Sequence, residues 1–495
     1  MNRRKRTWTV QELAAATGGM LLGGQRVREL PAGMATNDTR ALRSGGVFLA
    51  LQGTNMHGLS LWQQAQQAGA VAVLCGADAD ATMIRDAHDE LGDDVAIVTY
   101  PMPGIDMAGV VGRAWRRWAG FHVVGITGSS GKTTCKEITR NLLEQSFTVV
   151  ASTSNNNNEL GVPLTLLSAS PDTDVVICEM GMRGLGQIEY LCGIAEPDIG
   201  IITSVGSAHL ELLGSLENIA RAKSEIIAGV GSGTAIIPAD RPDLVALSGG
   251  APGRLIRFGA GGDIWVEQCA SDDAGIHGTI ADTAGWSASF AVPFHGLHNQ
   301  TNLAAACCVF RALGGTDEQL ARALHRPPAS WHVNIVGRGE RMHTSELGLL
   351  INDAYNANPE SMRAALDELA RAAHASHRVA VLGYMAELGS ASAQLHADLG
   401  DYAASLPIDE LVVVNTHPDV ESLAASWKAR RMRPPVMVDC ADDLLDSTAE
   451  WWPGEHGVTL VKASNSVGLG RVIDLFVERY GIADAHQRVP EGNPT

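Results

Sequence analysis

The stretch Gly125-Ile126-Thr127-Gly128-Ser129-Ser130-Gly131-Lys132-Thr133-Thr134 decides the fold of this chain. It continues an apolar run and precedes a helical pattern, so we expect a strand to end and a helix to begin here. Glycines let such a loop curl until backbone N–H groups face a phosphate chain, and the helix dipole adds attraction. Lys132 would neutralise the β- and γ-phosphates, and the Thr133 hydroxyl is a ligand for Mg²⁺. The predicted ATP-binding residues here are Gly128, Ser129, Ser130, Gly131, Lys132, Thr133 and Thr134.

The loop departs from the common P-loop pattern at one position. That pattern has glycine five residues before Gly131, where this chain has Ile126; its glycines stand at 125 and 128 instead. The alternative interpretation is a Gly/Ser turn that carries a surface lysine. We favour the phosphate loop because Gly-Lys-Thr-Thr follows a strongly apolar strand in the right register.

The sequence around the loop is typical of an α/β protein. Its 495 residues match the length of about three domains. Apolar runs such as Val175–Cys178 and Ile199–Ile202 suit a parallel sheet buried on both faces. Pro327-Pro328 indicates a linker, and a second α/β pattern follows it. We therefore expect a three-domain α/β fold, with an N-terminal α/β domain (1–105), a central P-loop parallel-sheet domain (106–327) and a C-terminal Rossmann-like domain (328–495).

Composition excludes several classes of protein. The net charge of −18 argues against general nucleic-acid binding. The sequence has no run of ~18 apolar residues, so we expect no membrane-spanning helix. The basic start, Met1–Arg6, is not followed by the apolar core of a secretory signal. The eight cysteines are scattered without a CxxC motif, which indicates a reduced compartment and no zinc module. We expect a cytoplasmic monomer.

Two side chains near strand ends are candidates for a metal site. Glu179 ends the apolar run Val175–Cys178, where an acid beside a phosphate loop can hold Mg²⁺. By itself this position is weak evidence for a metal ligand, because many strands end in an acidic residue. His209 follows the run Ile199–Ile202. A lone histidine is more often structural, so for His209 by itself we favour a structural role over metal binding.

Lys223 is more informative because of its place on a predicted helix. Residues 215–227 have helical periodicity, with Ser215 as N-cap and an apolar stripe on which position 223 falls. Glu217 and Arg221 lie off the stripe at i,i+4, as solvated charges do. A lysine on a buried face is uncommon unless it is paired or modified. The alternative is a lysine at the margin that extends its amine to solvent.

With these residues the chain resembles the Mur ligases over nearly its whole length. After the phosphate loop, the family's motifs occur in the expected order: Asn155–Thr165, Glu179–Gly184, Ala208–Leu210, Ala222-Lys223, Gly296–Ala305, Gly337-Arg338, Asp353–Pro359 and Met385–Gly389 with His396. Their joint order is very specific. The asparagine run and the segment Asp353–Pro359 favour the members that add D-alanyl-D-alanine over the folylpolyglutamate synthetases, which share the core. Asn358-Pro359 also has a local interpretation, as N-cap and first residue of a helix.

The resemblance implies a role for each candidate residue. Lys132, Glu179, His209 and Lys223 would be catalytic, and Mg²⁺ would be held by Thr133, Glu179, His209 and a CO₂-derived carbamate on Lys223. ATP would also contact Asn299 and Asn302 near adenine and ribose, and Arg338 and Asp353 from the C-terminal domain. The substrate-binding set would be Thr39 and Arg40 at the UDP end, Asn157, Asn158 and Arg183 at the acceptor peptide, and Asn356 and Ser464 in the C-terminal domain. A carbamate is an anionic oxygen ligand, which would account for a lysine on an apolar stripe.

The resemblance also implies a reaction in peptidoglycan precursor synthesis. ATP would convert the peptide carboxylate of a UDP-N-acetylmuramoyl tripeptide to an acyl phosphate, which the amine of D-alanyl-D-alanine attacks. The chain departs from the family at His57-Gly58-Leu59, in place of an acid-Gly-His triplet, and at Lys462-Ala463-Ser464-Asn465, in place of Lys-Gly-Ser-Arg. Two alternatives therefore stay open: a divergent Mur-type ligase joining a different acid and amine, and a non-catalytic P-loop protein that uses ATP as a switch.

Overall fold

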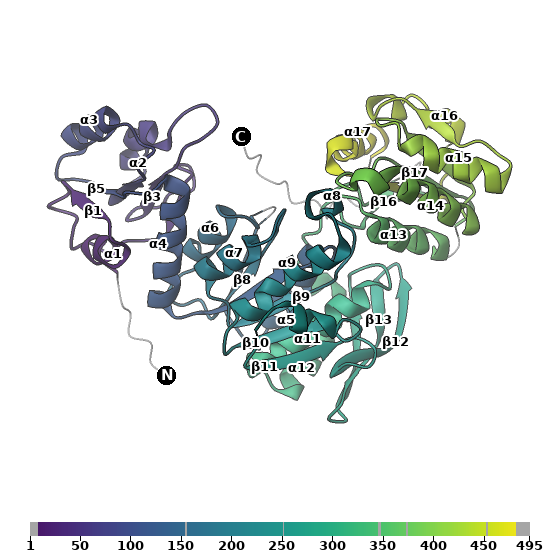
Figure 1. Cartoon of the computed structure of the whole chain (residues 1–495), viewed down its shortest axis with the longest axis horizontal. Coiled ribbons are helices and arrows are strands. Elements are labelled where there is room, and N and C mark those ends of the chain that lie inside the picture. The colour runs from purple at the N-terminus through teal and green to yellow at the C-terminus, as the bar shows by residue number, and fades with distance from the viewer. Residues whose placement is uncertain are drawn as a thin grey trace.

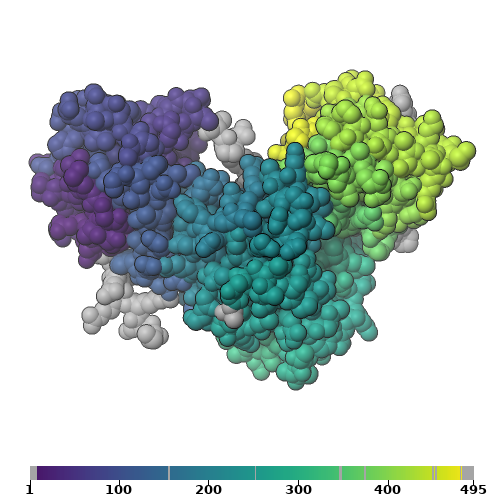
Figure 2. All heavy atoms as spheres, in the orientation of Figure 1, coloured from purple at the N-terminus to yellow at the C-terminus, as the bar shows by residue number. Residues whose placement is uncertain are grey.

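The chain folds into three α/β domains that follow one another along the sequence, as predicted (Figure 1). This computed structural model describes residues 8–481, apart from 154–155, 251, 345–347, 373–374 and 452–453. The basic start, Met1–Arg6, and Asn155 of the asparagine run therefore lie outside the described residues. The N- and C-terminal domains stand apart on either side of the central domain, which gives the molecule the outline of a wide V (Figure 2).

The N-terminal domain contains a five-stranded sheet in the order β1-β5-β4-β3-β2, in which only β1 is antiparallel to its neighbour. Its strands are β1 (Met20–Leu22), β2 (Ala35–Thr36), β3 (Val47–Ala50), β4 (Ala72–Cys75) and β5 (Ala96–Thr99). The helices are α1 (Val10–Thr17), α2 (Trp62–Gln67), α3 (Ala81–Leu91) and α4 (Gly104–Ala119). The side chains of β3 and β4 are buried throughout, as their continuous apolar runs predict.

The central domain is built on a nine-stranded sheet in the order β14-β13-β12-β11-β10-β9-β6-β8-β7. Its strands are β6 (His122–Thr127), β7 (Val149–Ala151), β8 (Val175–Glu179), β9 (Ile199–Ile202), β10 (Thr234–Pro238), β11 (Arg254–Phe258), β12 (Ile264–Asp272), β13 (Gly275–Asp282) and β14 (Ser287–Val292). Its helices are α5 (Lys132–Leu143), α6 (Gly161–Leu167), α7 (Gln187–Ala195), α8 (Leu210–Leu213), α9 (Leu216–Gly229), α10 (Asp243–Leu247), α11 (Asn299–Ala312) and α12 (Asp317–Leu324). The strands from β7 to β12 pair in parallel, whereas β12, β13 and β14 form an antiparallel extension that the sequence analysis did not predict.

The strand order of the central sheet fixes where its functional residues meet. β6 lies between β8 and β9 and is parallel to both. The carboxyl ends of these three strands therefore lie at one edge of the sheet, where open α/β sheets bind their ligands. Apolar side chains of α5 and α11 cover one face of the sheet, and those of α7 and α9 cover the other. The helix α5 begins at this edge, so the phosphate loop is held between two packed layers.

The C-terminal domain has a six-stranded sheet in the order β15-β16-β20-β17-β18-β19, parallel except for the β15–β16 pair. Its strands are β15 (Glu340–Thr344), β16 (Gly348–Asn352), β17 (Arg378–Leu382), β18 (Glu410–Val414), β19 (Val436–Val438) and β20 (Val458–Lys462). Its helices are α13 (Pro359–Arg371), α14 (Ser392–Ser405), α15 (Val420–Arg431), α16 (Thr448–Trp451) and α17 (Leu469–Tyr480). In the described part of the chain, no helix combines the length and the apolar character needed to cross a bilayer.

Three tryptophans pack together where the start of the chain meets α4 and the central domain. The rings of Trp8 and Trp118 stack with centroids 5.5 Å apart, and Trp115 lies 4.9 Å from Trp118. Trp115 is buried, and its indole N–H donates to the carbonyl of Ala169 in the central domain. The same apolar core continues from β3 and β4 into the central sheet. This cluster therefore couples the two domains through packing.

Replacing Trp115 with alanine is expected to destabilise this junction by roughly 3 kcal/mol, because a large buried ring is deleted from a close-packed cluster. The denaturant midpoint of unfolding measures the effect. Trp115→Phe keeps an aromatic ring and loses the hydrogen bond to Ala169, so a smaller loss is expected. Equal midpoints for Trp115→Ala and the wild type would contradict a packing role for the cluster.

Candidate active site

The predicted phosphate loop connects the buried strand β6 to α5. Two of its glycines are required by the geometry. Gly131 has φ +79°, and a Cβ atom there would lie 2.8 Å from Oδ1 of Asn302. A Cβ atom on Gly128 would lie 1.9 Å from Oγ1 of Thr203 at the end of β9. The loop therefore needs glycine at position 128, where its backbone approaches Thr203, although the common pattern has its glycine at position 126.

Not all of the loop amides point into open space. The N–H groups of Ser129 and Ser130 donate to the carbonyl and the hydroxyl of Ser204, at 3.0 and 2.9 Å. The first turn of α5 has no side-chain cap at its N-terminus. We therefore assign the anion-attracting end of the loop to the helix start, where the dipole is positive. The N–H groups of Ser129 and Ser130 are therefore directed at Ser204, although the sequence analysis places both residues among those that bind ATP.

Lys132 lies at the mouth of this loop. Its Nζ donates to the carbonyl of Gly128 at 2.7 Å, which folds the side chain back over the loop. Burial lowers the pKa of Lys132, and the charge on Arg338 lowers it further, whereas the Glu179 carboxylate raises it. A basic group from the C-terminal domain and an acid from β8 therefore both face the same ammonium.

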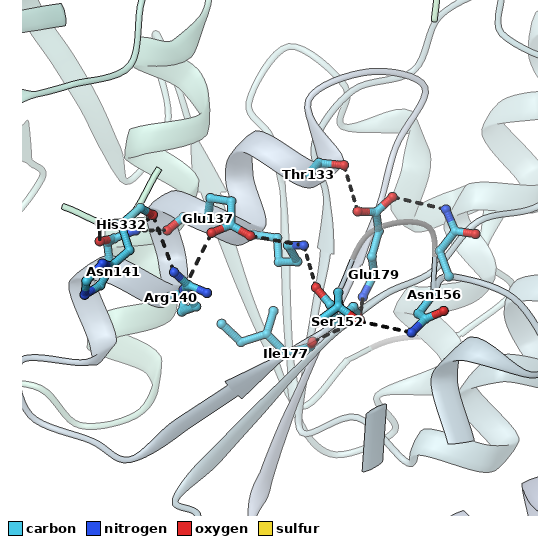
Figure 3. A network of polar contacts seen from close by, with 12 residues as sticks. Thr133, Glu137, Arg140, Asn141, Ser152, Asn156, Ile177, Glu179 and His332 are labelled. Carbon is cyan, nitrogen blue, oxygen red and sulfur yellow. Dashed lines mark hydrogen bonds and ion pairs between the residues drawn. The ribbon is translucent and has the colours of Figure 1, made fainter. Parts of the chain in front are cut away.

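The structure brings together two of the predicted magnesium ligands, Glu179 and Thr133. Glu179 ends β8 and is 3% exposed, and the Thr133 hydroxyl donates to its Oε2 at 2.9 Å (Figure 3). The side-chain amide of Asn157 donates to the other carboxylate oxygen at 3.2 Å. A buried carboxylate next to a hydroxyl at a phosphate loop is the hard oxygen donor set that Mg²⁺ prefers. These residues fit the ion, although the described residues contain no cluster of three His, Cys, Asp or Glu side chains suited to a metal.

His209 lies in the same cleft but faces another partner. Its Nδ1 is hydrogen-bonded to Oε2 of Glu387, in the C-terminal domain, and the Glu387 pKa is lowered mainly by this bond. Both residues have positive φ, +67° for His209 and +62° for Glu387, which is uncommon outside glycine. The structure thus brings His209 beside the metal site without turning it onto Glu179. Sequence reasoning quoted Glu387 only as part of a motif and missed this contact.

Lys223 is buried on α9, whose start and N-cap agree with the prediction. Ser215 accepts a hydrogen bond from the N–H of Asn218, and Arg221 pairs with Glu217 on the exposed side. Lys223 is 1% exposed, which excludes the alternative of an amine that extends to solvent. Burial lowers its pKa well below the ordinary value, and the nearby charge of Lys132 lowers it further. Within the described residues, no carboxylate lies within ion-pair distance of Lys223.

The C-terminal domain closes the site with Arg338, Asp353 and a lysine that the sequence analysis did not select. The Arg338 guanidinium lies 3.5 Å from the centre of the Tyr355 ring. Lys462 is 2% exposed, and its Nζ is 2.7 Å from Oδ2 of Asp353 and 2.8 Å from the carbonyl of Asn356. Lys462 therefore anchors the loop that carries Asp353 and Asn356. The sequence analysis named Lys462 only as the first residue of the segment Lys462-Ala463-Ser464-Asn465 and gave it no role of its own.

Direct contacts join the central and C-terminal domains across the cleft. Glu360, at the start of α13, accepts hydrogen bonds from the N–H and the hydroxyl of Ser207, both at 3.0 Å. The N–H of Glu211 donates to the carbonyl of Glu387 at 2.9 Å. The two domains enclose a cleft of about 1400 Å³. Its lining includes these predicted site residues: Ser129, Ser130, Gly131, Lys132, Thr133, Thr134, Asn157, Asn158, Glu179, Arg183, His209, Asn299, Asn302, Arg338, Asp353, Asn356 and Ser464.

Other contacts of the predicted residues are structural. Asn158 accepts a hydrogen bond from the N–H of Gly161 at 2.9 Å, and so holds the start of α6. Asn358 caps α13, with Pro359 as its first residue, as the local interpretation predicted. Asn302 donates to Asn299 at 2.7 Å beside the phosphate loop.

Thr39 and Arg40 lie in the N-terminal domain and do not line the cleft. Thr39 donates to Gln64 at 3.2 Å, and Arg40 pairs with Asp38 at 3.0 Å. Lys223 is also absent from the cleft lining, since it lies beneath the surface. Apart from Gly128, whose carbonyl accepts from Lys132 but which does not line the cleft, the candidate residues thus form one cleft cluster, one buried amine and one separate pair in the first domain.

Comparisons with known proteins agree with this geometry. Three family models match: the Mur ligase family catalytic domain over residues 34–106, the Mur ligase middle domain over 126–310, and the Mur ligase glutamate ligase domain over 337–465. A UDP-N-acetylmuramoyl-tripeptide–D-alanyl-D-alanine ligase from a Synechocystis strain is 36% identical, covering 88% of this chain and 90% of the relative.

Solved structures give the same result. MurF from Acinetobacter baumannii has a TM-score of 0.77 and 27% identity, covering 96% of this chain and 99% of that one. MurF from Thermotoga maritima in complex with ADP has a TM-score of 0.73 and 27% identity, covering 90% and 97%. The predicted resemblance and the three-domain fold are confirmed. This chain belongs to the Mur ligase family.

Proposed function

We propose that this chain is the ATP-dependent ligase that joins D-alanyl-D-alanine to the peptide carboxylate of a UDP-N-acetylmuramoyl tripeptide during peptidoglycan precursor synthesis. The observation that carries the proposal is the cleft itself. A phosphate loop, a buried carboxylate and the loops of a second domain surround one space that is large enough for a nucleotide and a peptide end. The names of the relatives, which cover most of the chain, support the choice of substrates.

The chemistry explains why such a site needs ATP. A carboxylate is a poor electrophile, because amide formation would expel oxide. Transfer of the γ-phosphoryl group to the carboxylate gives an acyl phosphate; the amine then attacks its carbonyl carbon and phosphate leaves, with ADP as the other product. Lys132 and the start of α5 hold the β- and γ-phosphates in line with the acid. Most of the acceleration comes from positioning and fixed charge.

Thr133 and Glu179 would hold Mg²⁺, which neutralises charge on the transferring phosphoryl group when it is bound. His209 and Lys223 would complete the site. A carbamate on Lys223 would replace a buried cation with an anionic oxygen ligand. The lowered pKa of Lys223 supports this role, because carbamylation consumes a neutral amine. The absence of an acidic partner for Lys223 among the described residues points the same way.

Four groups of residues would bind the substrates. The nucleotide would be held by Asn299, Asn302, Arg338 and Asp353. The acceptor peptide would be held by Asn157, Asn158 and Arg183. Asn356 and Ser464 would meet the incoming amine, and Thr39 and Arg40 would contact the UDP end. We also propose that the enzyme is a cytoplasmic monomer. One chain contributes all residues of the cleft, and its nucleotide substrates belong to that compartment.

The test is phosphate release from the purified protein with MgATP, UDP-N-acetylmuramoyl tripeptide and D-alanyl-D-alanine, with each component omitted in turn. We expect release only when all three are present, together with a pentapeptide product by mass. Release that needs neither acid nor amine would favour a nucleotide switch instead.

A second candidate is a Mur-type ligase for a different acid and amine. The loop after β20 favours it, because Ala463 and Asn465 replace residues that are usually glycine and arginine in the family. Ser464 and Asn465 line the cleft. Release that is absent with the first substrates but restored by another acid and amine would identify this candidate.

A further inference from the structure

The helix α5 buries a second lysine, one turn beyond the phosphate-binding Lys132. Lys136 is 2% exposed, and its Nζ donates to the carbonyl of Ser152 at 2.6 Å (Figure 3). The ammonium also lies 3.1 Å from Oε1 of Glu137, which is equally buried. Burying two charges is costly unless their hydrogen bonds are close. These bonds therefore hold Lys136 at a defined place behind the site.

Ser152 links this lysine to Glu179. Ser152 directly follows β7, and both its N–H and its hydroxyl donate to the carbonyl of Ile177, at 2.9 and 3.2 Å. The Ser152 hydroxyl also accepts from the N–H of Glu179 at 3.0 Å. Every polar atom of Ser152 is therefore engaged, and its carbonyl is the one that Lys136 holds. The end of β7 is thereby fixed on β8 at the residue that carries the metal-site carboxylate.

The segment that follows Ser152 returns to the same carboxylate. Asn157 accepts a hydrogen bond from the N–H of Gly181 at 2.7 Å through its carbonyl, and its side chain donates to Glu179. The Glu179 carboxylate is thus oriented by Thr133 on one oxygen and by Asn157 on the other. Both the backbone of Glu179 and the base of the Asn157 segment depend on Ser152.

We infer that Lys136 is a positioning residue for this reaction: through Ser152 it sets where the Glu179 carboxylate stands for Mg²⁺. The inference rests on the proposed function, because Glu179 is a proposed ligand of that ion. Hydrogen-bond partners behind a metal ligand orient it and tune its affinity, although they never touch the metal. Lys136 has this relation to Glu179 through a single intervening residue.

Glu137 offers a matched control because it extends the network in the opposite direction. Its second carboxylate oxygen lies 3.5 Å from Nε of Arg140. Asn141, one turn later, exchanges hydrogen bonds with the backbone of His332 in the linker that leads to the C-terminal domain. Glu137 is as buried as Lys136 and shares its ion pair, yet has no contact with Ser152 among the described residues.

The experiment compares Glu137→Gln with the double variant K136M/E137Q. Neither variant leaves the carboxylate of Glu137 buried without its lysine, and the two differ in the Lys136 ammonium and therefore in the contact with Ser152. Thermal unfolding is followed at a fixed ADP concentration while MgCl₂ is increased, because a ligand that binds the native state raises the midpoint. The readout is the Mg²⁺ concentration that gives half of the maximal stabilisation. Ser152→Ala tests the other half of the link, because it keeps the carbonyl that Lys136 holds and removes the hydroxyl that accepts from the N–H of Glu179.

We expect K136M/E137Q to need roughly tenfold more Mg²⁺ than E137Q, as for other substitutions behind a metal ligand. Ser152→Ala is expected to shift the requirement in the same direction, and it tests the Ser152–Glu179 half of the link if the double variant does not fold. E137Q should lower the midpoint without ligand and keep the wild-type Mg²⁺ requirement. Equal requirements for E137Q and K136M/E137Q, or a wild-type requirement in Ser152→Ala, would overturn the inference. A wild type that Mg²⁺ and ADP do not stabilise together would instead contradict the proposed nucleotide site itself, and the inference with it.

Discussion

Replacing Lys132 with alanine is expected to lower substrate-dependent phosphate release on the order of 10³-fold, the loss typical of removing one preorganised donor from a developing charge. The Lys132 ammonium is held over the phosphate loop by its 2.7 Å bond to Gly128. Glu179 and Arg338 are close enough to shift its pKa. No other lysine lines the cleft near the loop; Lys462 is committed to Asp353. Among the described residues that line the cleft, no other lysine is therefore available to take over its charge.

The measurement is steady-state phosphate release with all three substrates, at saturating MgATP. Lys428→Ala is the control, since Lys428 is an exposed lysine on α15. The control should keep wild-type turnover, and both variants should unfold at the wild-type midpoint. Substantial turnover in Lys132→Ala would refute the role of the P-loop lysine. It would then favour the start of α5 as the main source of phosphate stabilisation.

Local sequence patterns were sufficient to predict the parts of the site that depend on neighbouring residues. The apolar strand and glycine loop predicted the β6–α5 connection, and Ser215 predicted the start of α9. The periodicity of that helix placed Lys223 on its buried face, where it lies. These features depend on contacts within one or two turns of chain. Patterns in a single sequence record such contacts directly.

Features that depend on distant pairs were not predictable in this way. Glu387 meets His209 across 178 positions of sequence, and Lys462 contacts the Asp353 backbone across 109. Neither pair has a periodicity that would predict it. Lys136 was missed because the Gly-Lys-Thr-Thr motif drew attention to Lys132 alone. The antiparallel strands β12 to β14 were missed because much of β12 is exposed, so no continuous apolar run marks it.

Labelling with carbon-13 bicarbonate is expected to give a carbamate signal that disappears in Lys223→Ala. The physical reason is the environment of the amine. Lys223 is 1% exposed, and its pKa is lowered by burial and by Lys132. A lowered pKa favours the neutral amine, which is the form that reacts with CO₂. The product is an anion, which would relieve the repulsion from Lys132 and add an oxygen donor beside Glu179.

Activity should follow the modification. Wild-type enzyme prepared without CO₂ should lose phosphate release and regain it when bicarbonate is added. Lys223→Ala should stay at least on the order of 10²-fold slower whatever the bicarbonate, a loss comparable with removal of one electrostatic stabiliser. The comparison separates a missing carbamate from a general effect of CO₂ on the protein.

Lys136 is the internal control for the chemistry, because it is as buried as Lys223 but its ammonium pairs with Glu137. The Lys136 Nζ is held by the Glu137 carboxylate and the Ser152 carbonyl, so we expect no added CO₂ on the Lys136 peptide. Modification of both lysines would mean that burial alone drives the reaction. Modification of neither, with activity independent of bicarbonate, would leave Lys223 as an unmodified amine. The proposed magnesium ligands would then be Thr133, Glu179 and His209, the last of these after it leaves Glu387.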